Sequence, residues 1–147
     1  MSDNNYLGKT EKMSMILLTV FGIIISSRGV YWITNYSNAV HESPFYETLD
    51  RVAPLYIWGA PFLIGGILLM VASINIISQN TRRVFDVLLV AGGFISGLSF
   101  LIISMASMAS AFNWMTPVQN LCFAIGLFSL TWIGLDSLWK NKRNKTI

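Results

Sequence analysis

Residues 87–135 contain no charged side chain, and this stretch limits the possible fold more than any other feature of the chain. As one continuous helix it would be roughly 73 Å long at the α-helical rise per residue. The hydrocarbon core of a bilayer is only about 30 Å thick. The stretch therefore has to turn back once, and Trp114 and Pro117 mark the place, because proline interrupts helices strongly. Two membrane-spanning helices are predicted from it, at about residues 85–111 and 118–139.

The composition extends this interpretation to the whole chain. Hydrophobic residues make up 54% of the sequence and charged residues 12%, whereas a soluble domain has about 25% charged residues. Two more apolar runs, at about residues 13–33 and 55–78, each have the length of one membrane crossing. We therefore predict an all-α integral membrane protein, a bundle of four transmembrane helices that forms a single domain over residues 1–147.

The connection between the first two predicted spans is the longest polar segment. Ser43 suits the N-cap of a helix and Pro44 suits the first helical position. Phe45, Leu49 and Val52 then recur at helical spacing, with charged residues between them. This pattern predicts a short amphipathic helix that lies at the membrane interface in the first outer loop. An irregular polar loop is the alternative.

Basic residues are distributed unevenly between the connecting segments. The N-terminal segment, the link between the second and third spans and the C-terminal tail hold most of them: Lys9, Lys12, Arg82, Arg83, Lys140, Lys142, Arg143 and Lys145. Cytoplasmic segments of membrane proteins carry the excess of Lys and Arg. We therefore predict a multi-pass protein of the cell membrane with both termini in the cytoplasm. Most Trp residues lie near predicted interfaces, and Trp132, the exception, is expected to pack inside the bundle.

Arg28 lies within the first predicted span, where a charge is costly to insert and is a candidate for function. One interpretation is a residue for anion binding or gating. The other is a structural arginine that reaches the interface or pairs with an acidic residue of the first outer loop. We predict the second, with Arg28 tied to Glu42, Glu47 or Asp50.

Two carboxylates lie near the predicted cytoplasmic ends of spans. Asp86 follows Arg82 by four residues, and Asp136 precedes Lys140 by the same spacing. Side chains at this spacing are neighbours on a helix surface, so a local ion pair is predicted for each carboxylate. Neither lies near the middle of a span, where a proton-driven transporter would be expected to place one.

Small residues are concentrated in the third span, where Gly93 and Gly97 form a G-x-x-x-G pair. Such faces let helices approach closely. They indicate self-association, the binding of a membrane protein partner, or packing within a single bundle, and the sequence leaves these alternatives open.

No phosphate-binding loop, zinc-protease motif or nucleophile elbow is found. We expect no enzymatic activity, no cofactor, no metal and no nucleic acid partner. Apart from the lipid bilayer, the expected partner is a second copy or another membrane protein. The favoured function is that of an accessory or interaction protein that acts through helix packing. The alternatives are a phage- or mobile-element-encoded holin or superinfection-exclusion protein, and a small oligomeric channel or transporter.

Overall fold

The computed structural model describes residues 8–76, 82–110 and 114–143. Within these ranges the chain is helical, with short turns between the helices. The helices are α1 (Lys9–Thr34), α2 (Tyr36–His41), α3 (Pro44–Val52), α4 (Leu55–Asn75), α5 (Arg82–Ser110) and α6 (Met115–Arg143).

Four of these helices, α1, α4, α5 and α6, are long and apolar enough to cross a membrane. The chain is therefore a small polytopic membrane protein, and the prediction of four spans is confirmed. The helices α1, α5 and α6 begin a few residues before the predicted spans. The predicted end of the second span at residue 78, and of the third at residue 111, lie outside the described residues.

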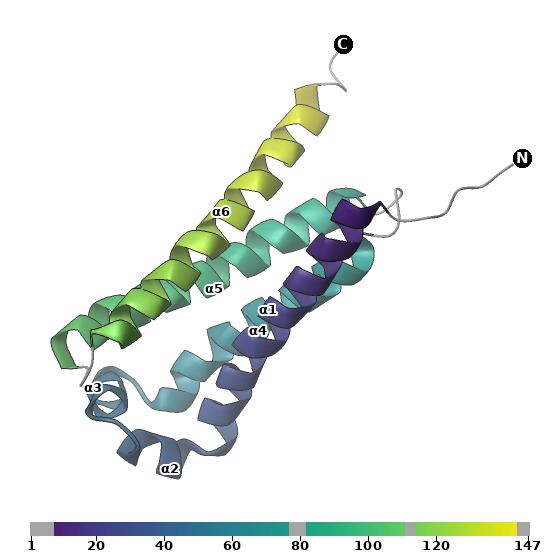
Figure 1. Cartoon of the computed structure of the whole chain (residues 1–147). Helices are drawn as coiled ribbons and strands as arrows, with labels where there is room; N and C mark the ends of the chain where they lie inside the picture. Colours follow the sequence, from purple (N-terminus) through teal and green to yellow (C-terminus); the bar gives the residue numbers. More distant parts are fainter. Residues whose placement is uncertain (1–7, 77–81, 111–113, 144–147) are drawn as a thin grey trace, which may run out of the picture.

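The long helices pack in the order in which they occur along the chain. Extensive contacts join α1 to α4, α4 to α5 and α5 to α6. The beginning of α1 and the end of α6 lie at the same end of the bundle, here called the terminal end, and α2 and α3 close the opposite end (Figure 1). The last turns of α6 extend away from the other helices (Figure 1).

Glycine makes the closest approach between α1 and α4 possible. A Cβ atom placed on Gly29 would lie 2.7 Å from the carbonyl oxygen of Gly59, and one placed on Gly59 would lie 2.9 Å from that of Gly29. The backbones of the two helices are therefore in direct contact here, as small-residue interfaces in membranes allow.

The short helix predicted between the first two spans is confirmed as α3. The Ser43 side chain accepts a hydrogen bond from the backbone N–H of Phe45, and Pro44 is the first helical residue. Phe45 and Leu49 are buried against the bundle. Helix α2 was not predicted, because the polar residues of this segment favour turns. The position of α3 at a membrane surface stays a prediction.

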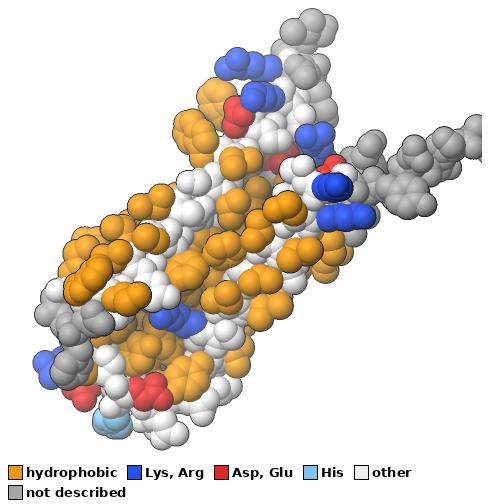
Figure 2. Space-filling model, viewed as in Figure 1, with side chains coloured by type: hydrophobic (Ala, Val, Ile, Leu, Met, Phe, Trp, Pro, Cys, Tyr) orange, Lys and Arg blue, Asp and Glu red, His pale blue; other side chains and the backbone are white. Residues whose placement is uncertain are grey.

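The surface of the bundle matches a lipid-facing protein. Hydrophobic side chains cover most of the length of the visible face, and most charged side chains lie towards its two ends (Figure 2). Large exposed hydrophobic residues occur on all four long helices. Such a surface would be unfavourable in water and is expected in a bilayer.

Candidate functional site

Arg28 is a charged side chain that lies among the long helices. Its guanidinium contacts residues from all four of them. The Nη1 atom donates a hydrogen bond of 3.1 Å to the Oδ1 atom of Asn120 on α6. The Cζ atom lies 5.7 Å from the ring centroid of Trp32 on α1, 5.9 Å from that of Phe62 on α4 and 5.5 Å from that of Phe100 on α5.

Packed aromatic rings surround the guanidinium of Arg28. Trp32 and Phe62 pack edge to face at 5.4 Å, and Phe62 and Phe100 do so at 5.0 Å. Phe123 stacks on Phe100 with 5.1 Å between ring centroids. The faces of these rings attract a cation, because their electron density is concentrated there. The resulting Arg28 cage consists of Trp32, Phe62, Phe100 and Asn120.

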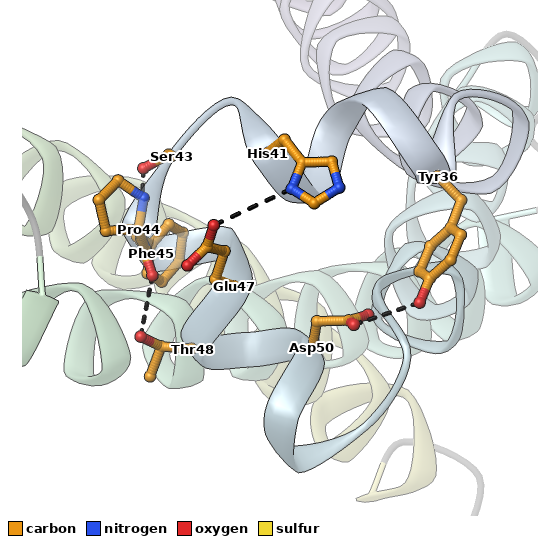
Figure 3. Close-up of polar contacts among 8 residues, drawn as sticks. All are labelled: Tyr36, His41, Ser43, Pro44, Phe45, Glu47, Thr48 and Asp50. Carbon is orange, nitrogen blue, oxygen red and sulfur yellow. Dashed lines mark hydrogen bonds and ion pairs between the residues drawn. The ribbon is translucent and has the colours of Figure 1, made fainter.

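The predicted ion pair between Arg28 and the connecting segment is wrong. Among the described residues, Arg28 has no carboxylate within 4 Å of its guanidinium, and the three candidate acids have other partners. Glu42 accepts a hydrogen bond from the hydroxyl of Tyr31. Glu47 forms an ion pair with His41 (Figure 3), with 4.0 Å between Oε1 and Nδ1.

Asp50 has a structural role that explains its position. Its carboxylate accepts a hydrogen bond of 2.9 Å from the backbone N–H of Leu55, the first residue of α4. It accepts a second, of 3.2 Å, from the hydroxyl of Tyr36, and Figure 3 shows this second bond. A negative charge at a helix N-terminus is stabilising. The hydrogen bond to Asp50, together with partial desolvation and the charge of Asp50, raises the pKa of Tyr36. Asp50 therefore ties α2 and α3 to α4 and leaves Arg28 without its expected partner.

Two hydrogen-bond donors next to Arg28 have no partner. Among the described side chains, the Nε1 atom of Trp32 and the Nδ2 atom of Asn120 are buried and make no hydrogen bond. The exposed fraction is 0% for Trp32 and 3% for Asn120. Unpaired buried donors are costly and are rare in folded proteins. Positive charge and unused donors therefore coincide at the Arg28 cage.

The two other carboxylates behave differently from each other. The predicted pair of Asp136 and Lys140 is confirmed, with 2.6 Å between Oδ2 and Nζ. The predicted pair of Asp86 and Arg82 is wrong. Asp86 is only 3% exposed and accepts a hydrogen bond of 2.7 Å from the hydroxyl of Ser137 on α6. Asp86 faces the bundle, so its partner comes from a neighbouring helix and not from its own.

Gly93 and Gly97 face α6 of the same chain. A Cβ atom on Gly93 would lie 2.7 Å from the Oγ1 atom of Thr131 and 3.0 Å from the backbone oxygen of Leu127. A Cβ atom on Gly97 would lie 3.3 Å from the ring of Phe128. Packing within one bundle therefore uses this face, which is one of the alternatives that the sequence left open.

A stripe of side chains on the last turns of α6 is exposed. Trp132 was predicted to pack inside the bundle, and this prediction is wrong, because 73% of its surface is accessible. The α6 stripe surrounds a shallow hollow of about 410 Å³ and consists of Trp132, Leu135, Asp136, Trp139, Lys140 and Arg143. Its members recur at spacings of three and four residues, so they share one side of the helix.

A groove runs between α1 and α6, the first and last long helices. These two helices approach each other through long side chains, as Phe21 and Phe123 do with 6.0 Å between ring centroids. One part of the α1–α6 groove has a volume of about 390 Å³ and includes Phe21, Gln119, Phe123 and Gly126. A second part, of about 440 Å³, is almost entirely apolar and continues along α1 to Leu17 and Ser14.

Sequence reasoning missed Asn120 and Gly126, which shape these two features. A signal for Asn120 was present, because an amide within an apolar span is costly unless it has a specific partner. No signal marked Gly126, since a glycine that lines a groove and one that packs against a helix look alike in sequence. Within residues 8–76, 82–110 and 114–143, no group of three or more His, Cys, Asp or Glu side chains is arranged to hold a metal ion.

Comparison with known proteins gives no relative. No protein-family model, no curated protein and no solved structure matches the chain. Function therefore has to be argued from the Arg28 cage, the α1–α6 groove and the α6 stripe.

Proposed function

We propose that this chain is a non-enzymatic accessory protein of a cell membrane, and that it binds a larger membrane protein through the α6 stripe. The observation that supports this proposal is the exposure of Trp132 and Trp139, which are 73% and 67% accessible on one side of α6. Tryptophan is strongly enriched among the residues that dominate binding energy at protein interfaces. The salt bridge of Asp136 and Lys140 belongs to the same stripe and offers polar groups for specificity.

The packing of α5 argues against a pore formed by its small residues. The hydroxyl of Ser104 donates to the backbone oxygen of Pro117 on α6, and those of Ser99 and Ser107 donate to backbone oxygens of α5 itself. Gly93 and Gly97 are covered by α6. The small side chains of α5 are thus used within the chain, which favours an interaction protein over a channel.

The proposed orientation places both termini in the cytoplasm. Lys9, Lys12, Arg82, Arg83 and Lys140 lie on helical turns at the terminal end of the bundle. The excess of basic residues marks the cytoplasmic side in most membrane proteins. In this orientation the α6 stripe lies near the inner surface of the membrane, where a cytoplasmic segment of a partner can also reach it.

Site-specific photo-cross-linking in native membranes tests the proposal. A photoreactive amino acid replaces Leu135 within the α6 stripe, and a matched control carries it at Ile125, which is exposed elsewhere on α6. We expect one protein adduct of defined mass from position 135 and none from position 125. The adduct should disappear when Trp132→Ala and Trp139→Ala are combined, while the melting temperature stays unchanged because both side chains are on the surface.

Three outcomes would contradict the proposal. Equal adducts from both positions, or adducts with lipid alone, would show that the α6 stripe only faces the bilayer. Dissipation of ion gradients by the purified protein in liposomes would indicate a channel. Abrupt lysis of the host on expression would indicate a holin.

A further inference from the structure

The Arg28 cage contains a positive charge without a counter-ion. The ring faces of Trp32, Phe62 and Phe100 attract the guanidinium but do not neutralise it. Asn120 contributes a neutral amide oxygen and Tyr46 a neutral hydroxyl group as hydrogen-bond acceptors, so neither residue compensates the charge. In the part of the chain that the structure describes, no acidic side chain lies within ion-pair distance of Arg28. An uncompensated charge among membrane-spanning helices is costly and indicates a missing partner.

The groups around Arg28 define the chemistry of that partner. Asn120 uses its oxygen to hold Arg28, so its Nδ2 donor, on the same amide, remains unpaired next to the guanidinium. The unpaired Nε1 of Trp32 belongs to the ring that lies against Arg28. Arginine, the amide nitrogen and the indole nitrogen all donate hydrogen bonds. The site therefore lacks an acceptor with negative charge, and a phosphate supplies several acceptor oxygens in a geometry that arginine matches.

The α1–α6 groove begins next to this site. Phe123 lines the groove and stacks on Phe100, which in turn lies against Arg28. From there the groove follows α1 past Phe21 towards the terminal end. Its walls are almost entirely apolar, and a Cβ atom on Gly126 would have no neighbour within 4 Å. The polar site at one end and the apolar α1–α6 groove that leads away from it match a molecule with an anionic headgroup and a hydrocarbon chain.

We infer that the bundle binds one anionic phospholipid, with its phosphate at Arg28, Asn120 and Trp32 and one acyl chain in the α1–α6 groove. Arg28 lies about 9 Å before the end of α1 at the helical rise per residue. This depth places the phosphate close to the headgroup level at the α2–α3 end, and the chain then points towards the middle of the bilayer. The inference does not depend on the α6 stripe, which lies at the terminal end on a different part of α6.

Native mass spectrometry of the full chain in an uncharged detergent tests the inference. Phosphatidylglycerol and phosphatidylcholine with identical acyl chains are the two lipid probes, and inorganic phosphate is added alone as a third. Both lipids carry a phosphate, but the quaternary ammonium of phosphatidylcholine makes its headgroup neutral and repels Arg28. We therefore expect one phosphatidylglycerol molecule to bind at least about tenfold more tightly than phosphatidylcholine. Inorganic phosphate alone should not displace it, because the acyl chain contributes to binding.

Two variants test the headgroup site, each against a control. Arg28→Gln should lose the preference for phosphatidylglycerol, whereas Lys12→Gln, which removes an exposed charge from the same helix, should keep it. Asn120→Asp should also lose the preference, because the new carboxylate supplies the counter-ion internally. Its melting temperature should be at least that of the wild type, so loss of binding in this variant cannot be attributed to unfolding.

A third variant tests the groove. Gly126→Trp fills the α1–α6 groove at a position where the structure leaves space, and should weaken binding of both lipids. Ile125→Trp adds the same side chain on an exposed part of α6 and should leave binding unchanged. Equal binding of the two lipids by the wild type, or an unchanged preference in Arg28→Gln, would overturn the inference. Displacement of the lipid by inorganic phosphate would overturn it as well and would assign the site to a free anion.

Discussion

Adding a single methyl group at Gly29 should destabilise the bundle, because α1 and α4 touch backbone to backbone there. In Gly29→Ala the new Cβ atom would lie 2.6 Å from the backbone nitrogen of Leu63, 2.7 Å from the oxygen of Gly59 and 3.0 Å from the Cα atom of Leu63. All three neighbours are backbone atoms of a helix, so none can rotate away. The two helices have to separate instead.

The size of the effect follows from these distances. Ordinary contacts of a Cβ atom lie at 3.4–4 Å, so α1 must move by roughly 1 Å, a gap that forfeits a quarter to a half of the dispersion energy of each contact. Overpacking of this kind costs about 1–3 kcal/mol. Alanine recovers up to about 1 kcal/mol of helix propensity relative to glycine. We therefore expect a net loss of about 1–2 kcal/mol.

Unfolding by sodium dodecyl sulfate in mixed micelles, followed by circular dichroism, measures this loss. Gly126→Ala is the matched control, because its Cβ atom meets nothing within 4 Å and it gains the same helix propensity. The control should be as stable as the wild type or slightly more stable. If Gly29→Ala unfolds at the same detergent fraction as the control, the close approach of α1 and α4 is not a determinant of stability.

Three further predictions concern the polar contacts of the bundle. Ser137→Ala removes the hydrogen bond to the buried carboxylate of Asp86 and should lower the free energy of unfolding by about 1–3 kcal/mol. Ser137→Thr keeps a hydroxyl and should lose less stability in the same unfolding assay. Ser43→Ala removes the N-cap of α3 and should destabilise this helix by about 0.5–2 kcal/mol. Amide hydrogen exchange should accelerate within α3 and remain unchanged in α5. The raised pKa of Tyr36 means that folding stabilises the protonated phenol. The contribution of Tyr36 to the stability of the fold is therefore complete below the unfolded-state pKa of about 10, and it is lost as the pH rises through the higher folded-state pKa. The tyrosinate absorbance that develops at high pH should therefore decrease in Tyr36→Phe, and in Asp50→Asn the Tyr36 phenol should titrate at a lower pH than in the wild type. An unchanged titration of Tyr36 in Asp50→Asn would refute the assignment to Asp50.

The sequence predicts the four spans and α3 because both depend on local information. Hydropathy over about twenty residues identifies a membrane-spanning helix without reference to its neighbours. The N-cap of Ser43 and the proline that follows it are equally local. Helix α2 was missed because Asn35, Ser37 and Asn38 favour turns in isolation, whereas the structure buries Ala39 against the bundle.

The partners of Arg28 and Asp86 could not be predicted in this way. The predictions paired Asp86 with a base of the same helix at i,i+4 spacing and Arg28 with an acid of the following loop, but both side chains contact other helices. Asn120 lies far from Arg28 along the chain, and Ser137 lies far from Asp86. The rotation of each helix about its axis decides which of its residues contact the neighbouring helices. When a helix has apolar residues on every side, its sequence does not indicate this rotation.

Packing in chain order has a consequence for how this protein is made. Each long helix after the first packs extensively against the long helix that precedes it: α4 on α1, α5 on α4 and α6 on α5. A span that leaves the translocation machinery therefore meets its partner already in the bilayer, and no span has to wait for a later one. Contacts that are close in sequence also form quickly. Biogenesis can proceed one hairpin at a time, and the contacts of Arg28 and Phe21 with α6 close the bundle only when the last helix arrives.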